Sequence, residues 1–240
     1  MSSVMHLLKD TQSKIDFRVS ARIEYERRVA SKDTVLDVGG RSGTSHSNRT
    51  LRGLSTNAKT RIVATDVIAD YRPDLVDDIC NTQIPSCTFD GVYCAAVLEH
   101  VEDYTSAVVN IHKVLRPGGE VFIYVPFFWC FHDVMDYHRF TFTELERLLR
   151  IFSEYKLFVP DGNGYGGVLW QVLTFYQISR FPGLWRVLSA LVNSAITVPT
   201  ALAYFVVRHK HTGNEITWAR FRFYYIHLRM NHGFCAWAKK

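Results

Sequence analysis

The stretch that decides the fold is Thr34-Val-Leu-Asp-Val-Gly-Gly-Arg-Ser-Gly43, a short apolar run that ends in an acid and a cluster of glycines. A short apolar run bounded by turn residues is typical of a buried strand. Glycines let the backbone pass close to a ligand, and a helix that follows offers free N–H groups. We therefore expect a strand over 34–38 and a ligand-binding turn directly after it.

Outward from this stretch, apolar runs alternate with helix-like segments. Further strands are expected at 61–66, 76–79, 89–96 and 120–125, and helices at 106–115 and 143–152. Thr143 with Glu146 forms a candidate capping box for the second helix, and Arg116-Pro-Gly-Gly119 marks a stop between elements. Residues 1–31 are expected to form one or two amphipathic helices. This alternation predicts a parallel α/β sheet with helices on both faces.

Composition excludes a disordered chain and a disulfide scaffold. The 240 residues are 48% hydrophobic and 21% charged, which is globular and suits one domain. The N-terminus lacks a secretory signal, so we expect a cytoplasmic protein. The cysteines are odd in number and contain no Cys-x-x-Cys pair, so we expect reduced thiols: Cys80, Cys87, Cys94, Cys130 and Cys235.

The last third differs from the rest. Residues 187–207 carry no charge, and this stretch is long enough to span a membrane. Pro199 and several polar residues instead favour a pair of apolar helices at 168–180 and 184–207, which packs on the domain or lies in the membrane interface. From Arg208 onward, seven basic residues face one acid, Glu215. Such a tail suits an anionic partner, which can be phospholipid headgroups, a phosphorylated substrate or nucleic acid, or else it is a solvated basic face. Nucleic acid is not expected as a partner, because no recognised RNA-binding module is present.

The glycine turn fits neither the dinucleotide fingerprint nor a phosphate-binding P-loop, because the spacing and the lysine are missing. What remains is a series of acids after successive strands. Asp37 precedes the glycines, Asp66 ends the second strand and Asp78 closes the third candidate strand. An acid at the second position can accept hydrogen bonds from a ribose diol, and one at the third can meet an adenine amino group.

Together these pieces resemble class I S-adenosylmethionine-dependent methyltransferases of the type 11 kind, over 33–159 and the closing strand at 233–239. The resemblance implies one Rossmann-like domain over 1–240, S-adenosylmethionine as cofactor, and an antiparallel final strand preceded by an apolar and basic helical insertion at 160–230. Arg41 replaces the family's middle glycine and either crowds the cofactor or turns away to meet a carboxylate. The implied cofactor residues are Asp37, Gly39, Gly40, Gly43, Asp66, Asp78, Ile79, Ala95 and Ala96.

The segment after the strand at 120–125 is a candidate acceptor site. A histidine titrates near neutrality, so His132 and His138 are candidate bases, with Asp136 to orient them. Two other interpretations stay open: the residues pin the loop structurally, or His132, Asp133, Asp136 and His138 bind a metal. The candidate substrate residues are His100, Tyr137 and Arg139.

This segment also resembles the His…Asp-Tyr-x-Arg-Phe/Tyr-Thr pattern of methyltransferases associated with bacterial surface polysaccharides. The resemblance implies O-methylation of a glycan or lipid-linked saccharide hydroxyl, at the cytoplasmic face of the membrane. Two alternatives remain at this stage. One is a small-molecule methyltransferase whose insertion acts as a substrate lid. The other is a degenerate, non-catalytic scaffold that binds the cofactor or a membrane.

Overall fold

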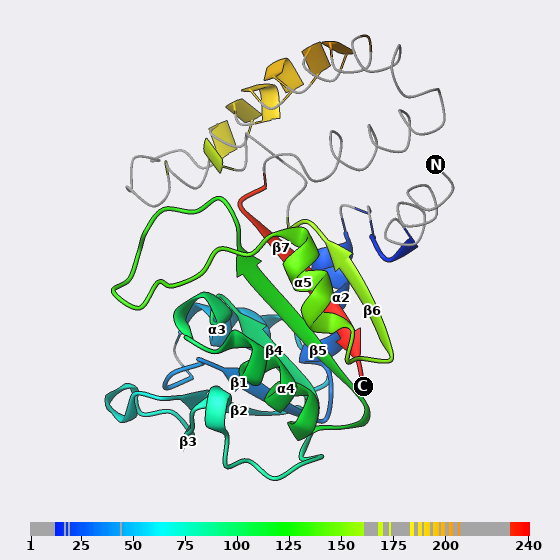
Figure 1. Cartoon of the computed structure of the whole chain (residues 1–240). Helices are drawn as coiled ribbons and strands as arrows, with labels where there is room; N and C mark the ends of the chain where they lie inside the picture. The colour runs from blue at the N-terminus through cyan, green and yellow to red at the C-terminus, as the bar shows by residue number, and fades with distance from the viewer. Residues whose placement is uncertain are drawn as a thin grey trace.

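The computed structural model describes residues 13–160 apart from 17, 19 and 44, then 231–240, and individual helical residues between 168 and 206. The described residues form a sheet in the order β3-β2-β1-β4-β5-β7-β6 (Figure 1). β7 runs antiparallel to both of its neighbours, and the other pairs are parallel. The expected α/β sheet with an antiparallel final strand is confirmed. The strands are β1 (Thr34–Val38), β2 (Arg61–Asp66), β3 (Leu75–Val76), β4 (Phe89–Ala95), β5 (Leu115–Pro126), β6 (Glu154–Phe158) and β7 (Gly233–Lys239).

Helices cover both faces of the sheet, because alternate strand residues point to opposite sides. Val35, Tyr93 and Phe122 pack in one core with residues of α2 and α3. Neighbouring strand residues, such as Leu36 and Val92, pack in the other core with α4 and α5. The helices are α2 (Ala21–Ala30), α3 (His46–Leu54), α4 (Tyr104–Val114) and α5 (Phe142–Leu149), with short 3-10 helices η1 (Ala69–Tyr71), η2 (Ile79–Asn81) and η3 (Leu98–His100).

A buried carboxylate fixes α2 to the sheet. Glu120 of β5 is 2% exposed and accepts hydrogen bonds from Arg28 Nε (2.7 Å), Lys32 Nζ (2.7 Å) and Trp237 Nε1 of β7 (2.8 Å). Burial alone would raise the pKa of Glu120, but these donors outweigh it and hold the pKa below its usual value. A paired buried carboxylate of this kind is costly to break, since either partner alone would be left uncompensated.

The N-terminal prediction is wrong in part. Ile15 forms a β-bridge with Leu157 of β6, and α2 begins only at Ala21. The helix buries Val29, whereas Ile23 is 47% exposed. The apolar spacing was misleading because Ile15 belongs to a sheet contact rather than to the helix. Residues before 13 lie outside the described part of the chain.

Two boundaries also differ from the sequence expectations. β5 starts at Leu115, so the expected stop at 116–119 lies inside the strand, next to an irregularity in its pairing with β4. α5 is capped by Thr141, whose hydroxyl accepts a hydrogen bond from the Glu144 N–H at 3.2 Å, two residues before the expected capping box. Glu146 is instead buried, with Lys14 at 3.6 Å.

Most of the expected insertion at 160–230, including its basic part, lies outside the described residues. Several large apolar side chains of its described helical residues are exposed: Leu184, Val187, Leu191, Val198 and Leu202. Over the residues that the structure describes, no helix combines the length and apolar character needed to cross a membrane.

Candidate functional site

The turn after β1 is shaped by close packing. Gly39 has a φ of 69°, and a Cβ there would lie 2.8 Å from Val97 Cγ2. A Cβ at Gly40 would collide with the carboxylate of Asp37. Gly43 also has a positive φ, of 71°. A side chain fits poorly at these positions, so the turn keeps its bare backbone toward the end of the sheet.

Asp37 is fully buried at the carboxyl half of β1. Its Oδ2 accepts a hydrogen bond from Asn48 Nδ2 at 2.8 Å, whereas its Oδ1 is buried with no hydrogen-bond partner among the described residues. Burial raises the pKa of Asp37 to about 6, although Asn48 and the nearby Arg52 act in the opposite direction. A buried acceptor left open in this way marks a position for a donor from a ligand.

Arg41 adopts the left-handed conformation, with a φ of 53°, that a glycine would occupy more easily. Its guanidinium lies over the Tyr71 ring, 4.5 Å from the centroid. The side chain thus turns away, but toward an aromatic ring rather than the expected carboxylate. A cation–π contact of this kind holds the arginine to one side of the turn.

The other implied cofactor residues follow β2, β3 and β4. Asp66 is half-buried, and its Oδ1 accepts a hydrogen bond from the Ile68 N–H at 3.0 Å. Asp78 is exposed and caps η2 through the Cys80 N–H at 2.9 Å, because β3 ends at Val76 and the expected strand does not continue to 79. The remaining three are Ile79, which is buried in the core, half-buried Ala95, and exposed Ala96.

The segment after β5 brings His132, Asp136 and Arg139 together. The Asp136 side chain is inaccessible to solvent, pairs with both terminal nitrogens of Arg139, and lies 3.2 Å from His132 Nδ1. The hydrogen bonds from Arg139 lower the pKa of Asp136 to about 2. His132 Nδ1 also lies 3.1 Å from the Cys130 carbonyl oxygen. The ring is therefore held on one side by two hydrogen-bond acceptors.

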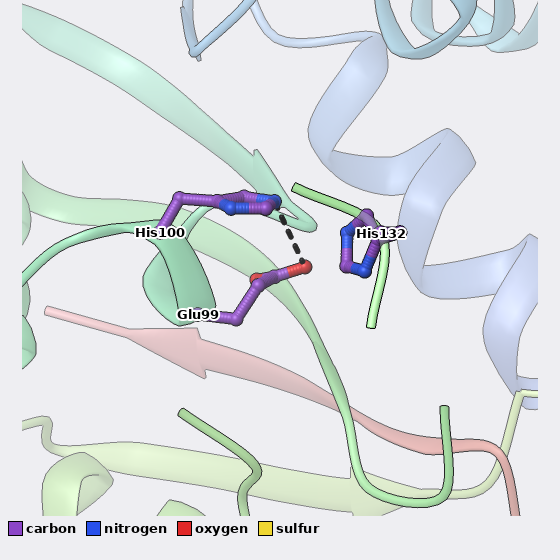
Figure 2. Close-up of side chains that lie close together, drawn as sticks. All are labelled: Glu99, His100 and His132. Atoms are coloured by element: carbon purple, nitrogen blue, oxygen red, sulfur yellow. Dashed lines mark ion pairs between the residues drawn. The ribbon is translucent and has the colours of Figure 1, made fainter. Parts of the chain in front are cut away.

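Two residues of η3 complete this corner, and the sequence indicated only one of them. His100 packs edge-on to His132, with ring centroids 5.0 Å apart. Glu99 is 1% exposed, and its Oε1 lies 3.8 Å from His100 Nε2 (Figure 2). Burial raises the pKa of Glu99 to about 7. In the sequence, Glu99 stands out only as an acid after the apolar Val97 and Leu98. The proximity of Glu99 to His132 is a tertiary contact that the sequence does not indicate.

His138 lies apart from the Asp136 pair. Its Nε2 is 3.3 Å from the Glu102 carbonyl oxygen, and its ring packs edge-on to Tyr104, with centroids 4.8 Å apart. The backbone N–H groups of His138 and Tyr137 both donate to the Glu99 carbonyl oxygen. These bonds hold the segment after β5 against η3, and the Tyr137 side chain is exposed.

Comparison with known proteins relates this chain to methyltransferases. Residues 36–123 match the family model of the methyltransferase domain. Among curated proteins, ubiquinone biosynthesis O-methyltransferase of Azotobacter vinelandii is 33% identical over 111 residues, covering 42% of this chain and 47% of the relative. The enzyme of the same name from Pseudomonas paraeruginosa is 31% identical over 109 residues, covering 41% and 46%. The chain thus matches about half the length of these relatives.

Among solved structures, an S-adenosylmethionine-dependent methyltransferase from Archaeoglobus fulgidus superposes with a TM-score of 0.51 at 15% identity, covering 92% of this chain and 93% of that one. A Haemonchus contortus phosphoethanolamine N-methyltransferase, solved with S-adenosylhomocysteine, also gives 0.51, at 13% identity, covering 91% and 52%. Residues 36–123 thus match a methyltransferase domain, and the fold is the one seen in S-adenosylmethionine-dependent methyltransferases. The relatives named above carry a ubiquinone name rather than the expected polysaccharide association.

Replacing Asp37 by asparagine should flatten the dependence of stability on pH. Because burial raises the pKa of Asp37 from 3.8 to about 6, the folded chain binds this proton more tightly than the unfolded chain. Stability from this group is thus full at low pH and falls as the pH rises toward about 6, by about 3 kcal/mol. The advantage of Asp37→Asn over wild type should grow by that amount between about pH 4 and pH 7.

Urea denaturation at each pH, without added ligand, measures this difference. Asp70→Asn serves as the control, because Asp70 is exposed next to the same edge of the sheet. Parallel pH profiles for Asp37→Asn and wild type would show that burial does not raise the pKa of Asp37.

Proposed function

We propose that this chain is an S-adenosylmethionine-dependent O-methyltransferase that acts on a hydroxyl group of a small-molecule acceptor. The observation that supports this most directly is the close packing of Gly39 against Val97. This packing joins the glycine turn after β1 to the turn after β4 that carries Glu99 and His100. A cofactor held on the glycine turn would then have polar side chains beside its reactive end.

The residues around the turn fit this cofactor. The bare backbone at Gly39 allows close approach, and the open Oδ1 of Asp37 can accept a hydrogen bond from an ammonium group. Asp66, oriented by the Ile68 N–H, would hold the ribose hydroxyls, and Asp78 would face the adenine. We infer these roles from the position of each acid after a parallel strand.

The cofactor, when bound, supplies an electrophilic methyl group. The chain must hold the acceptor oxygen in line and remove its proton. His132 suits the second task, because its Nδ1 faces two acceptors, the Cys130 carbonyl and the Asp136 carboxylate. Nδ1 therefore carries the ring proton, and Nε2 keeps the lone pair that can take a proton from the acceptor.

Two acceptor classes have separate support. The pattern at 132–141 favours a saccharide hydroxyl, on a glycan or a lipid-linked saccharide, and this is our first choice. The name of the curated relatives favours an aromatic hydroxyl of the kind found in ubiquinone precursors. The two differ in acidity, since a phenol ionises near pKa 10 and a saccharide hydroxyl is a much weaker acid. A saccharide therefore needs the base more.

His132→Ala should lower kcat about 100- to 10,000-fold on a methyl hexoside and less on catechol, while KM for S-adenosylmethionine stays unchanged. Transfer of a radiolabelled methyl group to each probe measures both constants. His112→Ala is the matched control. His112 lies on α4, where its ring packs against Phe152 rather than against the residues around His132. If the His132 variant turns over at the wild-type rate on the acceptor that works, His132 is not the base.

We further propose that the segment around 184–202 rests on a membrane surface. Its exposed apolar side chains recur at three- and four-residue spacings, as in Leu184, Val187 and Leu191, which is typical of an interfacial helix. The basic residues beyond 207 would add attraction to anionic lipid. The protein would then be a peripheral one, at the cytoplasmic face.

Flotation with vesicles tests this association. We expect the full chain to float with vesicles that contain anionic phosphatidylglycerol, less so at high salt, and poorly after Leu191→Glu with Leu202→Glu. Val109→Glu is the control, because Val109 is also an exposed apolar residue, but on α4. Failure of the wild type to float with anionic vesicles would remove the membrane proposal.

A further inference from the structure

Three side chains from two separate segments converge next to the candidate acceptor site. Glu99 and His100 come from η3, and His132 comes from the segment after β5 (Figure 2). One ligand atom from each lies within 4.8 Å of the other two. A tetrahedral ion with bonds of about 2.1 Å would bring its ligands to roughly 3.4 Å from one another, so the ligand atoms need to approach one another by at most about 1.4 Å.

Both histidines are oriented in the same sense. His100 Nδ1 lies 2.8 Å from the Met135 carbonyl oxygen, and His132 Nδ1 faces the Cys130 carbonyl and the Asp136 carboxylate. Because each Nδ1 faces only acceptors in these contacts, it carries the proton, and the lone pair sits on Nε2. Metal-binding histidines are oriented in this way by carbonyl and carboxylate groups behind them.

The environment of Glu99 is a second, separate observation that points to a bound cation. It is 1% exposed, its Oε2 is buried without a hydrogen-bond partner among the described residues, and its Oε1 points to His100 Nε2. Nearby, the Asp136 charge is balanced by Arg139, whereas the Glu99 carboxylate faces only His100, which is a cation only when it is protonated. A buried carboxylate with an open oxygen is stabilised by a cation.

We propose that Glu99, His100 and His132 bind a divalent transition-metal ion, with zinc as the representative ion. Two imidazoles and one carboxylate favour zinc and its neighbours over magnesium or calcium, which prefer oxygen ligands. The His100 and His132 side chains are 24% and 22% exposed, so one side of the site is open to solvent. Three protein ligands with an open position are typical of catalytic rather than structural zinc.

This site deepens the proposed function at one residue. In the metal-free protein the His132 lone pair is free to take the acceptor proton. In the metal-bound protein the same lone pair would be a ligand, and the ion would supply the acidity that His132 no longer provides as a base. Zinc binding itself is measured with neither cofactor nor acceptor, so its result is separate from the outcome for methyl transfer.

The experiment uses the full chain, treated with a chelator and desalted, then titrated with zinc by calorimetry. We expect one ion per chain, with at least tenfold weaker binding in Glu99→Gln and in His132→Asn. Glu102→Gln is the matched control, because Glu102 lies three residues from Glu99 but is exposed. Circular dichroism confirms that each variant is folded.

Cys130 lies two residues from His132, so its thiolate must be excluded as a ligand. The Cys130→Ser variant should bind zinc as tightly as the wild type. Substituted cobalt should show the visible bands of nitrogen and oxygen ligation without a thiolate band in the near ultraviolet. Three results would overturn the site: no zinc bound by the wild type, equal affinity in Glu99→Gln and Glu102→Gln, or loss of binding in Cys130→Ser.

Discussion

The site depends on one constraint: β1, β2, β3, β4 and β5 run parallel, so their carboxyl ends meet at one edge of the sheet. The order β3-β2-β1-β4-β5 reverses direction at β1 and β4. The helix after β1 therefore packs on one face, and the helix after β4 packs on the other. A crevice between them is the position where such sheets bind ligands. The glycine turn, Asp66 and the segment after β5 all lie at this edge because each follows one of these strands.

Two buried carboxylates mark the two halves of the edge. Asp37 lies beneath the glycine turn and Glu99 lies in η3, and each has one buried oxygen without a partner among the described residues. Burial raises the pKa of both, which is a cost to the folded protein. Glu120 shows the contrast, because three donors surround it and its role is to hold α2 on the sheet. Open buried acids fit ligand binding, whereas satisfied ones fit structure.

Much of the fold could be predicted because it depends on local patterns. The apolar runs at 34–38, 61–66 and 89–96 and the glycine turn mark the parallel strands directly. The errors arise where a distant contact decides the outcome. Ile15 joins β6 rather than a helix, and Glu146 is buried instead of capping α5. The sequence does not indicate the place of Glu99 near His132 or the contact of Arg41 with the Tyr71 ring. Spacing along the chain carries no information about which loops come into contact. His132 and Asp136 do lie together, since a separation of four residues within one segment is enough to bring their side chains close.

The most direct measurement of the central claim is a calorimetric titration of the purified chain with S-adenosylmethionine, with Asp66→Ala and Asp70→Ala alongside. Asp66 ends β2 at the ligand-binding edge, whereas Asp70 is exposed in η1 four residues later. If the edge of the sheet holds the cofactor, the wild type and Asp70→Ala bind with similar affinity, and Asp66→Ala binds at least tenfold more weakly. Absence of binding by the wild type, or equal binding by Asp66→Ala, would contradict the assignment of the cofactor to this edge.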